Sequence, residues 1–246
     1  MKRLFLEGRY DSLVTKLSNT LLVIIKDSYS STQSPAGEFG GKKIYYTKSE
    51  TVPNIEDDKQ QSAVYFEEVE NATIPVEFYL QLKIQWIDGF DDLRYGGDAF
   101  NDSKRDSDDP PLIEVRMQID PAEYPQVLSQ IAMNLRDTLR HEIEHVTQSG
   151  WNTIDSKYIP SDQATRKKIE TGALPPARYF TLPKEIDAMI QGLYLRAKKT
   201  RTPFKQVVDN YFNIWIQNDS ITEKDKQNIL NVWRKRLPAL SIRQEI

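Results

Sequence analysis

The 246-residue sequence predicts a mixed α+β protein, in which a helix and several strands precede a helical C-terminal half. Three observations predict this class: helical spacing of apolar residues over 11–28, four strand patterns between residues 43 and 119, and helical patterns over much of 124–236. Because strands and helices occupy separate stretches, the order is typical of a small, mostly antiparallel sheet with helices packed beside it.

The N-terminal half contains the predicted sheet. The helix over 11–28 can be capped by Asp11, and a loop follows over 29–41. Strands are expected over 43–47, 62–66, 76–86 and 112–119, and apolar residues alternate along the third. Residues 88–110 contain eight Asp. We expect a solvated loop there, since the spacing does not match a calcium-binding EF-hand.

The C-terminal half is predicted to be helical around one irregular segment. A long helix is expected over 124–148, and further helices over 183–199, 203–217 and 222–236. Residues 149–180 contain several Gly and Pro and are expected to be irregular. We expect a single domain over 1–246, with the N-terminal helix and sheet in 1–120, a central part in 121–200 and C-terminal helices in 201–246.

Composition excludes several classes of site. The chain has no Cys, so disulfides, Cys-ligated zinc and thiol nucleophiles are excluded. A net charge of -3 gives no general reason to expect nucleic acid as a partner. No run of 18 apolar residues exists, so no membrane span is expected. Glu7 and Asp11 interrupt the start too early for a secretory signal, which predicts a cytoplasmic protein.

The two His residues of the chain lie in one motif, His141-Glu142-Ile143-Glu144-His145. On a helix, residues four apart lie on one face, so two imidazoles can bind one zinc ion with a Glu beside it. Chance would produce this HExxH pattern in about one of 2,000 random arrangements of this composition. Glu142 borders apolar residues, where an unpaired charge would be costly. A role as a general base explains a carboxylate at this position better than a charge without a function does.

A zinc site usually needs a third protein ligand, and here it must be Asp or Glu. Glu185 is the best candidate because it falls in the first turn of the helix over 183–199, with Thr181 as a cap. Asp187 is an alternative ligand or an acceptor that orients a ligand His. The remaining alternatives are Asp155, Asp162 and Glu170.

With His141, Glu142, His145 and a following Glu185, residues 60–200 resemble the zincin metallopeptidases, of the gluzincin type. The resemblance implies a zincin-like fold, a Zn²⁺ cofactor, a protein or peptide substrate, and an edge strand that holds it. The strand over 111–119 is expected near that edge. The chain departs from the family at Met189, where an Asp is usual. The opening MKRLFLEGRYDSLVTKLS also resembles uncharacterised proteins of large tailed bacteriophages.

The implied reaction is zinc-assisted hydrolysis, with Glu142 as the general base. Arg178, Tyr179 and Tyr194 are candidates for stabilising the oxyanion, and Tyr179 is preferred.

A non-catalytic zincin-scaffold protein is the alternative function, acting in the phage virion or its assembly with phage structural proteins. The basic clusters 198–201 and 234–236 support that alternative, although solvated helix faces explain them as well and make nucleic acid a weak candidate. The phage likeness places the protein in the host cytoplasm or on the virion.

Overall fold

The computed structural model describes residues 10–33, 35–39, 42–51, 64–69, 72–88, 94–100, 111–124, 126–147 and 159–246. They form two compact units, an N-terminal unit over 10–146 and a C-terminal unit over 147–246. Both helices and strands are present, as the α+β prediction requires.

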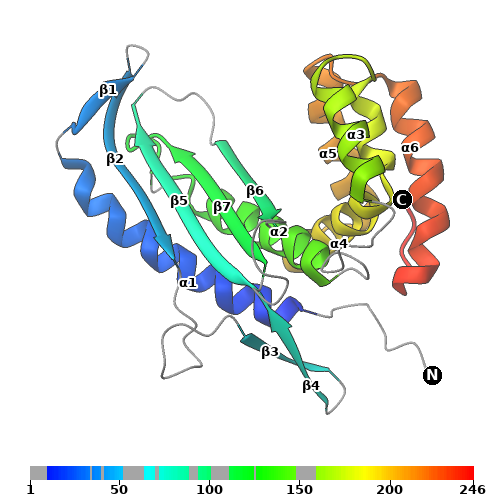
Figure 1. The fold of residues 1–246 in the computed structure, drawn as a ribbon, viewed down its shortest axis with the longest axis horizontal. Coiled ribbons are helices and arrows are strands. Elements are labelled where there is room, and N and C mark those ends of the chain that lie inside the picture. The colour runs from blue at the N-terminus through cyan, green and yellow to red at the C-terminus, as the bar shows by residue number, and fades with distance from the viewer. Residues whose placement is uncertain are drawn as a thin grey trace. The chain divides into compact units, whose positions relative to one another are not determined.

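The N-terminal unit contains two helices and seven strands among its described residues (Figure 1). The bounds are α1 Asp11–Tyr29, β1 Gly37–Phe39, β2 Lys42–Thr51, β3 Val64–Val69, β4 Ala72–Glu77, β5 Tyr79–Ile87, β6 Arg94–Phe100, β7 Leu112–Ile119 and α2 Leu128–Thr147, with a 3₁₀ turn η1 Ser30–Gln33 after α1.

One five-stranded sheet has the order β1-β2-β5-β7-β6, and β3 and β4 form a separate hairpin. All pairs in the larger sheet are antiparallel except β5 with β7, which is parallel. The predicted strand over 76–86 is divided at Phe78, between β4 and β5. The strand expected near the edge, β7, is the second strand of the sheet: it pairs on both sides, and β6 is the outer strand.

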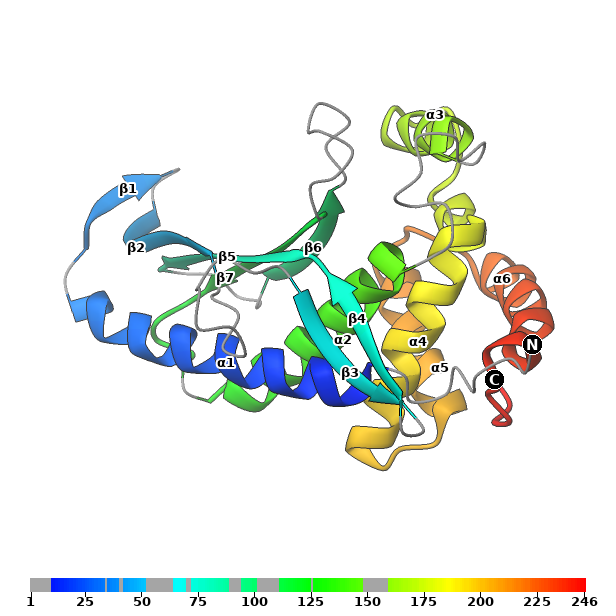
Figure 2. The ribbon, with the colours of Figure 1, turned by 60° about the horizontal axis from the view of Figure 1, so that its bottom comes forward.

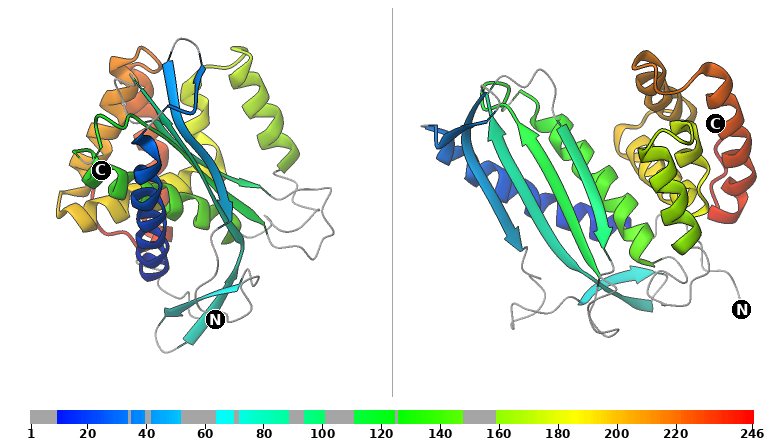
Figure 3. Two further views of the ribbon diagram at one scale, coloured as in Figure 1. Left: turned by 90° about the vertical axis from the view of Figure 1, so that its left-hand side faces the viewer. Right: turned by 45° about the horizontal axis from the view of Figure 1, so that its top comes forward.

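Helices α1 and α2 cover the same face of this sheet (Figure 2). Alternate side chains of β5 and β7 are buried on that face, as the period of two predicts. This core of the unit contains strand residues Leu80, Leu82, Ile84, Trp86, Ile113, Val115, Met117 and Ile119. Its helix residues are Leu17, Leu21 and Ile25 of α1 and Ile131, Leu135, Leu139 and Ile143 of α2. No described helix of this unit covers the opposite face (Figure 3).

The C-terminal unit is helical throughout its described part. Its elements are α3 Ile159–Glu170, η2 Pro176–Thr181, α4 Pro183–Thr200, α5 Phe204–Gln217, α6 Glu223–Arg236 and η3 Leu237–Leu240. The core contains Phe180, Ile190, Phe204, Phe212 and Trp233. The indole Nε1 of Trp233 donates to the carbonyl of Phe180 at 2.9 Å, so η2 is fixed to α6 inside the unit.

Two segments predicted to be irregular contain regular structure. The Asp-rich segment 88–110 includes β6. This strand can form with few apolar residues because it is an outer strand that pairs with one neighbour, β7. The segment 149–180 includes α3, where Pro160 lies in the first turn, which tolerates Pro, and Gly172 ends the helix at φ 73°. The rest of 88–110 is described only at Asp88, so its conformation is not assigned.

Candidate metal centre

The two histidines converge on one face of α2. The Nε2 atoms of His141 and His145 are 3.0 Å apart, and the ring centroids are 4.6 Å apart at 85°. His145 is buried and His141 is half-buried. The helical spacing of the motif therefore brings two imidazole nitrogens together, as the sequence predicts for this pair.

The buried side chains of α2 fix which face the histidines occupy. Leu135, Leu139 and Ile143 lie in the core on the sheet side of the helix. Arg140 is also buried, and its Nη1 donates to Glu144 at 2.8 Å. The same guanidinium lies 3.9 Å from Asp11 of α1. The residue next to His141 thus ties α2 to the start of α1.

The start of α1 differs from the prediction that Asp11 caps the helix. The N-cap is Tyr10, with a left-handed φ of 70° and no side-chain cap. Asp11 is the first helical residue, and its carboxylate faces Arg140 instead.

Glu142 is buried, with 4% of its surface exposed, and lies where α2 approaches β6. A Cβ atom at Gly97 of β6 would overlap Thr138 Cγ2 and would lie 3.2 Å from Oε1 of Glu142. Val115 of β7 is the register partner of Gly97 and is buried on the same face. The candidate base is therefore held against an outer strand.

The pair of imidazoles fits a divalent ion of the zinc type. Nitrogens that each lie about 2.0–2.1 Å from one tetrahedral ion are separated by about 3.3 Å. The observed 3.0 Å between the Nε2 atoms is close to that separation. Neutral imidazole nitrogens are also ordinary ligands of zinc, and the donor set includes no sulfur.

Glu185 lies in the C-terminal unit, in the first turn of α4, and is fully buried. A carboxylate in the first turn is stabilised by the positive end of the helix dipole. The Nη2 of Arg166, on α3, donates to its Oε1. The cap differs from the prediction: Leu182 is the N-cap, and the Thr181 hydroxyl donates to the carbonyl of Arg178.

Asp187 forms a bidentate pair with an arginine of its own unit. Both of its oxygens accept hydrogen bonds from Arg236 of α6, each at 2.6 Å. This bidentate pair lies within the C-terminal unit and joins α4 to α6. The role of Asp187 as an acceptor that orients a ligand His stays a prediction, since each of its oxygens can accept a further hydrogen bond.

Of the other alternative ligands, the structure describes the side chain of Glu170. Glu170 is exposed at the end of α3, beside Lys167 and Lys168. Asp162 lies in the first half of α3, and the position of its side chain is outside the described part of the structure. Asp155 lies outside the described residues altogether.

The preferred oxyanion candidate, Tyr179, shares a partner with Glu185. The Arg166 guanidinium lies over the Tyr179 ring, 5.3 Å from its centroid. Arg166 thus contacts both predicted site residues of this unit. Sequence reasoning missed it because α3 was not predicted, although Pro160 near the start and Gly172 after the end signal a helix there.

The other two oxyanion candidates have different surroundings. Arg178 is exposed on η2. Tyr194 is buried in the core of the C-terminal unit. The centroid of its ring lies 5.2 Å from that of Phe204 and 5.1 Å from the Nζ of Lys198.

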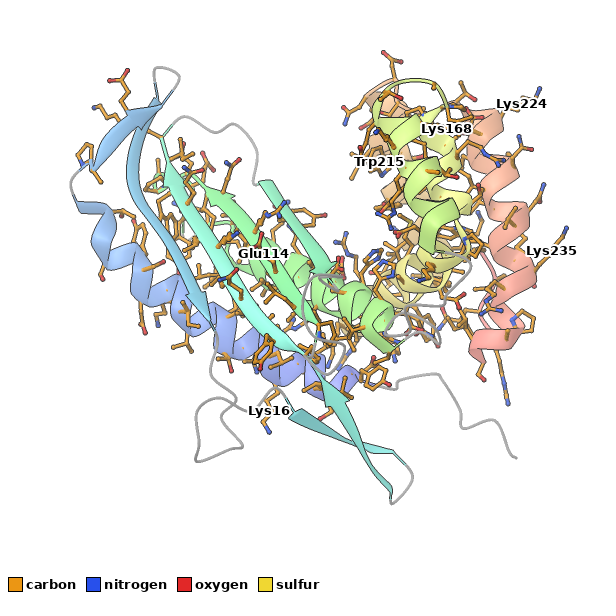
Figure 4. The ribbon with its side chains drawn as sticks, viewed as in Figure 1. Lys16, Glu114, Lys168, Trp215, Lys224 and Lys235 are labelled. Carbon is orange, nitrogen blue, oxygen red and sulfur yellow. The ribbon has the colours of Figure 1, made fainter. Side chains whose placement is uncertain are left out.

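The basic clusters are partly used in internal contacts. Arg236 binds Asp187, and Arg234 donates to the carbonyl of Ile246 at 2.9 Å. Lys224 and Lys235 instead extend outward from α6 (Figure 4). These contacts account for two of the three residues of the cluster 234–236 in structural terms.

Comparison with protein-family models, with curated proteins and with solved structures gives no match. Among the residues that the structure describes, no helix has the length and apolar character needed to cross a membrane.

Proposed function

We propose that this protein is a zinc-dependent peptidase with a zincin-like catalytic arrangement. The observation that carries the proposal is the convergence of the His141 and His145 Nε2 atoms beside a buried Glu142. The order of elements also supports it, because a sheet is followed by the HExxH helix α2 and then by α4 with Glu185.

The third ligand in this proposal is Glu185. Its support is its place in the chain and in its own unit: it is a buried carboxylate in the first turn of α4, a helix that follows the HExxH helix. The bond from Arg166 to Oε1 is compatible with this role, since a carboxylate has two oxygens with about four acceptor sites in total. An arginine on one oxygen and a metal on the other is an ordinary arrangement.

Each residue then has a defined task in peptide hydrolysis. Zinc would supply Lewis acidity, which polarises a carbonyl and acidifies a water molecule. Glu142 takes a proton from the attacking water and passes it to the leaving amine. Tyr179 and Arg166 are donors for the negative charge that develops on the carbonyl oxygen. The outer strand β6 is the edge on which an extended substrate would lie.

The decisive variants are Glu142→Gln and His145→Ala. Gln keeps the shape of Glu but cannot accept the proton, so zinc should remain bound while turnover falls by about 10²–10⁴-fold. His145→Ala removes a ligand and should lose both zinc and turnover. Bound zinc and cleavage of a mixed peptide library are measured for the parent and both variants.

The outcomes separate the peptidase from the alternative function. Full activity in Glu142→Gln would exclude the mechanism, whatever the zinc content. A parent that binds zinc without cleaving any peptide would favour a non-catalytic zincin-scaffold protein of a phage virion or assembly pathway.

A further inference from the structure

Two adjacent glycines of β6 have different surroundings. Gly97 faces α2, where a Cβ atom would overlap Thr138 Cγ2 and would lie 3.2 Å from Cγ and Oε1 of Glu142. A Cβ atom at Gly96 would meet nothing within 4 Å. This difference follows from the alternation of a strand, because successive side chains point to opposite faces.

Backbone conformation does not require glycine at either position. Among the glycines that the structure describes, Gly172 is the one with a positive φ. Ala can therefore adopt the backbone of β6 at residues 96 and 97 without left-handed strain. Glycine is required at 97 because the strand closely approaches the helical turn of α2 that contains Thr138 and Glu142.

We propose that Gly97 is a positioning residue for Glu142, which rests on the proposed function of Glu142 as a general base. The missing side chain lets the Glu142 carboxylate lie directly against the strand. A methyl group there would displace the carboxylate, because 3.2 Å from carbon to Oε1 and Cγ is tighter than ordinary packing. Gly97 therefore determines the position of the Glu142 carboxylate relative to His141 and His145, which lie on the same helix.

The test compares Gly97→Ala, Gly97→Ala with Thr138→Ser, and Gly96→Ala. Ser lacks the Cγ2 methyl of Thr, so Thr138→Ser removes the overlap with a new Cβ but leaves the two contacts with Glu142. Gly96→Ala makes the same chemical change on the open face of the same strand. Thr138→Ser alone is the reference for the double variant.

Gly97→Ala should lower both the melting temperature and kcat, while Gly96→Ala should leave the melting temperature and the position of the Glu142 carboxylate as in the parent. In the double variant the melting temperature should return to that of Thr138→Ser. Its kcat should stay about tenfold below the reference with little change in KM, since misplacement of a catalytic group by about 1 Å can cost about 10²-fold. Crystal structures of the parent and the double variant should differ in the position of the Glu142 carboxylate.

A double variant with the kcat of Thr138→Ser, or with an unmoved Glu142 carboxylate, would overturn the proposal. A double variant that does not fold would also overturn it, because Gly97 would then serve packing and not the base. A parent without peptidase turnover counts against the proposed function alone, since the crystal structures still decide whether Gly97 positions Glu142.

Discussion

The Arg166 side chain contacts two residues that the peptidase proposal uses, Glu185 and Tyr179. Guanidinium groups hold carboxylates in a fixed orientation because their donors lie in a rigid plane. Arg166 therefore restricts how the Glu185 carboxylate can turn, and the effect of losing it is measurable as a change in metal affinity.

Arg166→Met should weaken zinc binding by about 10–100-fold, the usual cost of removing a partner that orients a metal ligand. Arg178→Met is the matched control, because Arg178 is an exposed arginine of the same unit. Zinc affinity is measured by competition with a chelator. A rise in affinity would show instead that Arg166 competes with the metal for the carboxylate.

Glu114 of β7 provides a pH-dependent prediction at the level of one residue (Figure 4). Burial by itself would raise the pKa of the Glu114 carboxyl. Hydrogen bonds and charges from Lys83 and Arg116 outweigh burial and hold that pKa below its ordinary value of 4.5. A lowered pKa in the folded state means that the carboxylate stabilises the fold above its unfolded pKa, and that this stability is lost as pH falls through the folded pKa.

Glu114→Gln should therefore lower the free energy of unfolding by about 1 kcal/mol at pH 7, since Lys83 and Arg116 are half-exposed and screened. The difference from the parent should shrink below pH 4.5, as the carboxyl of the parent becomes protonated. Urea unfolding from pH 3 to 7 measures it. Gln118→Ala breaks a neutral pair with Gln85 on the same face, and its effect should not depend on pH.

At the scale of a single element, helix α6 begins with a capping box formed by Thr222 and Asp225. The Asp225 backbone N–H donates to the Thr222 hydroxyl at 3.1 Å, and the Thr222 N–H donates to the Asp225 carboxylate at 3.0 Å. Trp233 and Leu230 of this helix lie in the core of the C-terminal unit. The cap therefore supports a helix on which the core of that unit depends.

Thr222→Ala should destabilise the C-terminal unit by about 1 kcal/mol, the usual cost of losing a Thr cap. Thr200→Ala is the control: its exposed hydroxyl bonds only the Arg196 carbonyl within α4, so its loss should cost less than about 0.5 kcal/mol. Urea unfolding followed by circular dichroism compares the two. Equal losses would show that the cap contributes nothing beyond an exposed hydroxyl.

At the scale of the whole molecule, metal binding is linked to folding, because the proposal needs ligands from the folded chain. An ion that binds only the folded protein stabilises it by about 2.7 kcal/mol when the free ion exceeds its Kd by about 100-fold. Zinc should therefore raise the unfolding temperature of the parent.

Glu185→Gln should lose most of that zinc-dependent increase, because the third ligand is gone. Glu170→Gln, an exposed change on α3, should keep it. Asp187→Asn should lower stability without zinc, through its pair with Arg236, yet keep the zinc-dependent increase. Calorimetric scans with and without zinc measure all three, and an unchanged increase in Glu185→Gln would remove Glu185 from the site.

The sequence by itself determined the elements with strong periodicity and the histidine pair. Helices α1, α4, α5 and α6 and strand β7 lie within one or two residues of their predicted bounds, because each buries a regular apolar face. His141 and His145 meet because residues four apart share one face of any α-helix. These properties are local, so neighbouring residues in the chain suffice to predict them.

The tertiary structure decided the features that depend on distant partners. Strand β6 exists because β7 offers it an edge, and its Gly97 lies on Glu142 because the register with Val115 turns it toward α2. Arg236 binds the Asp187 carboxylate from 49 positions away in the chain, a pairing that the sequence did not predict. No periodicity encodes such pairings, because register and packing choose the partner after the elements have formed.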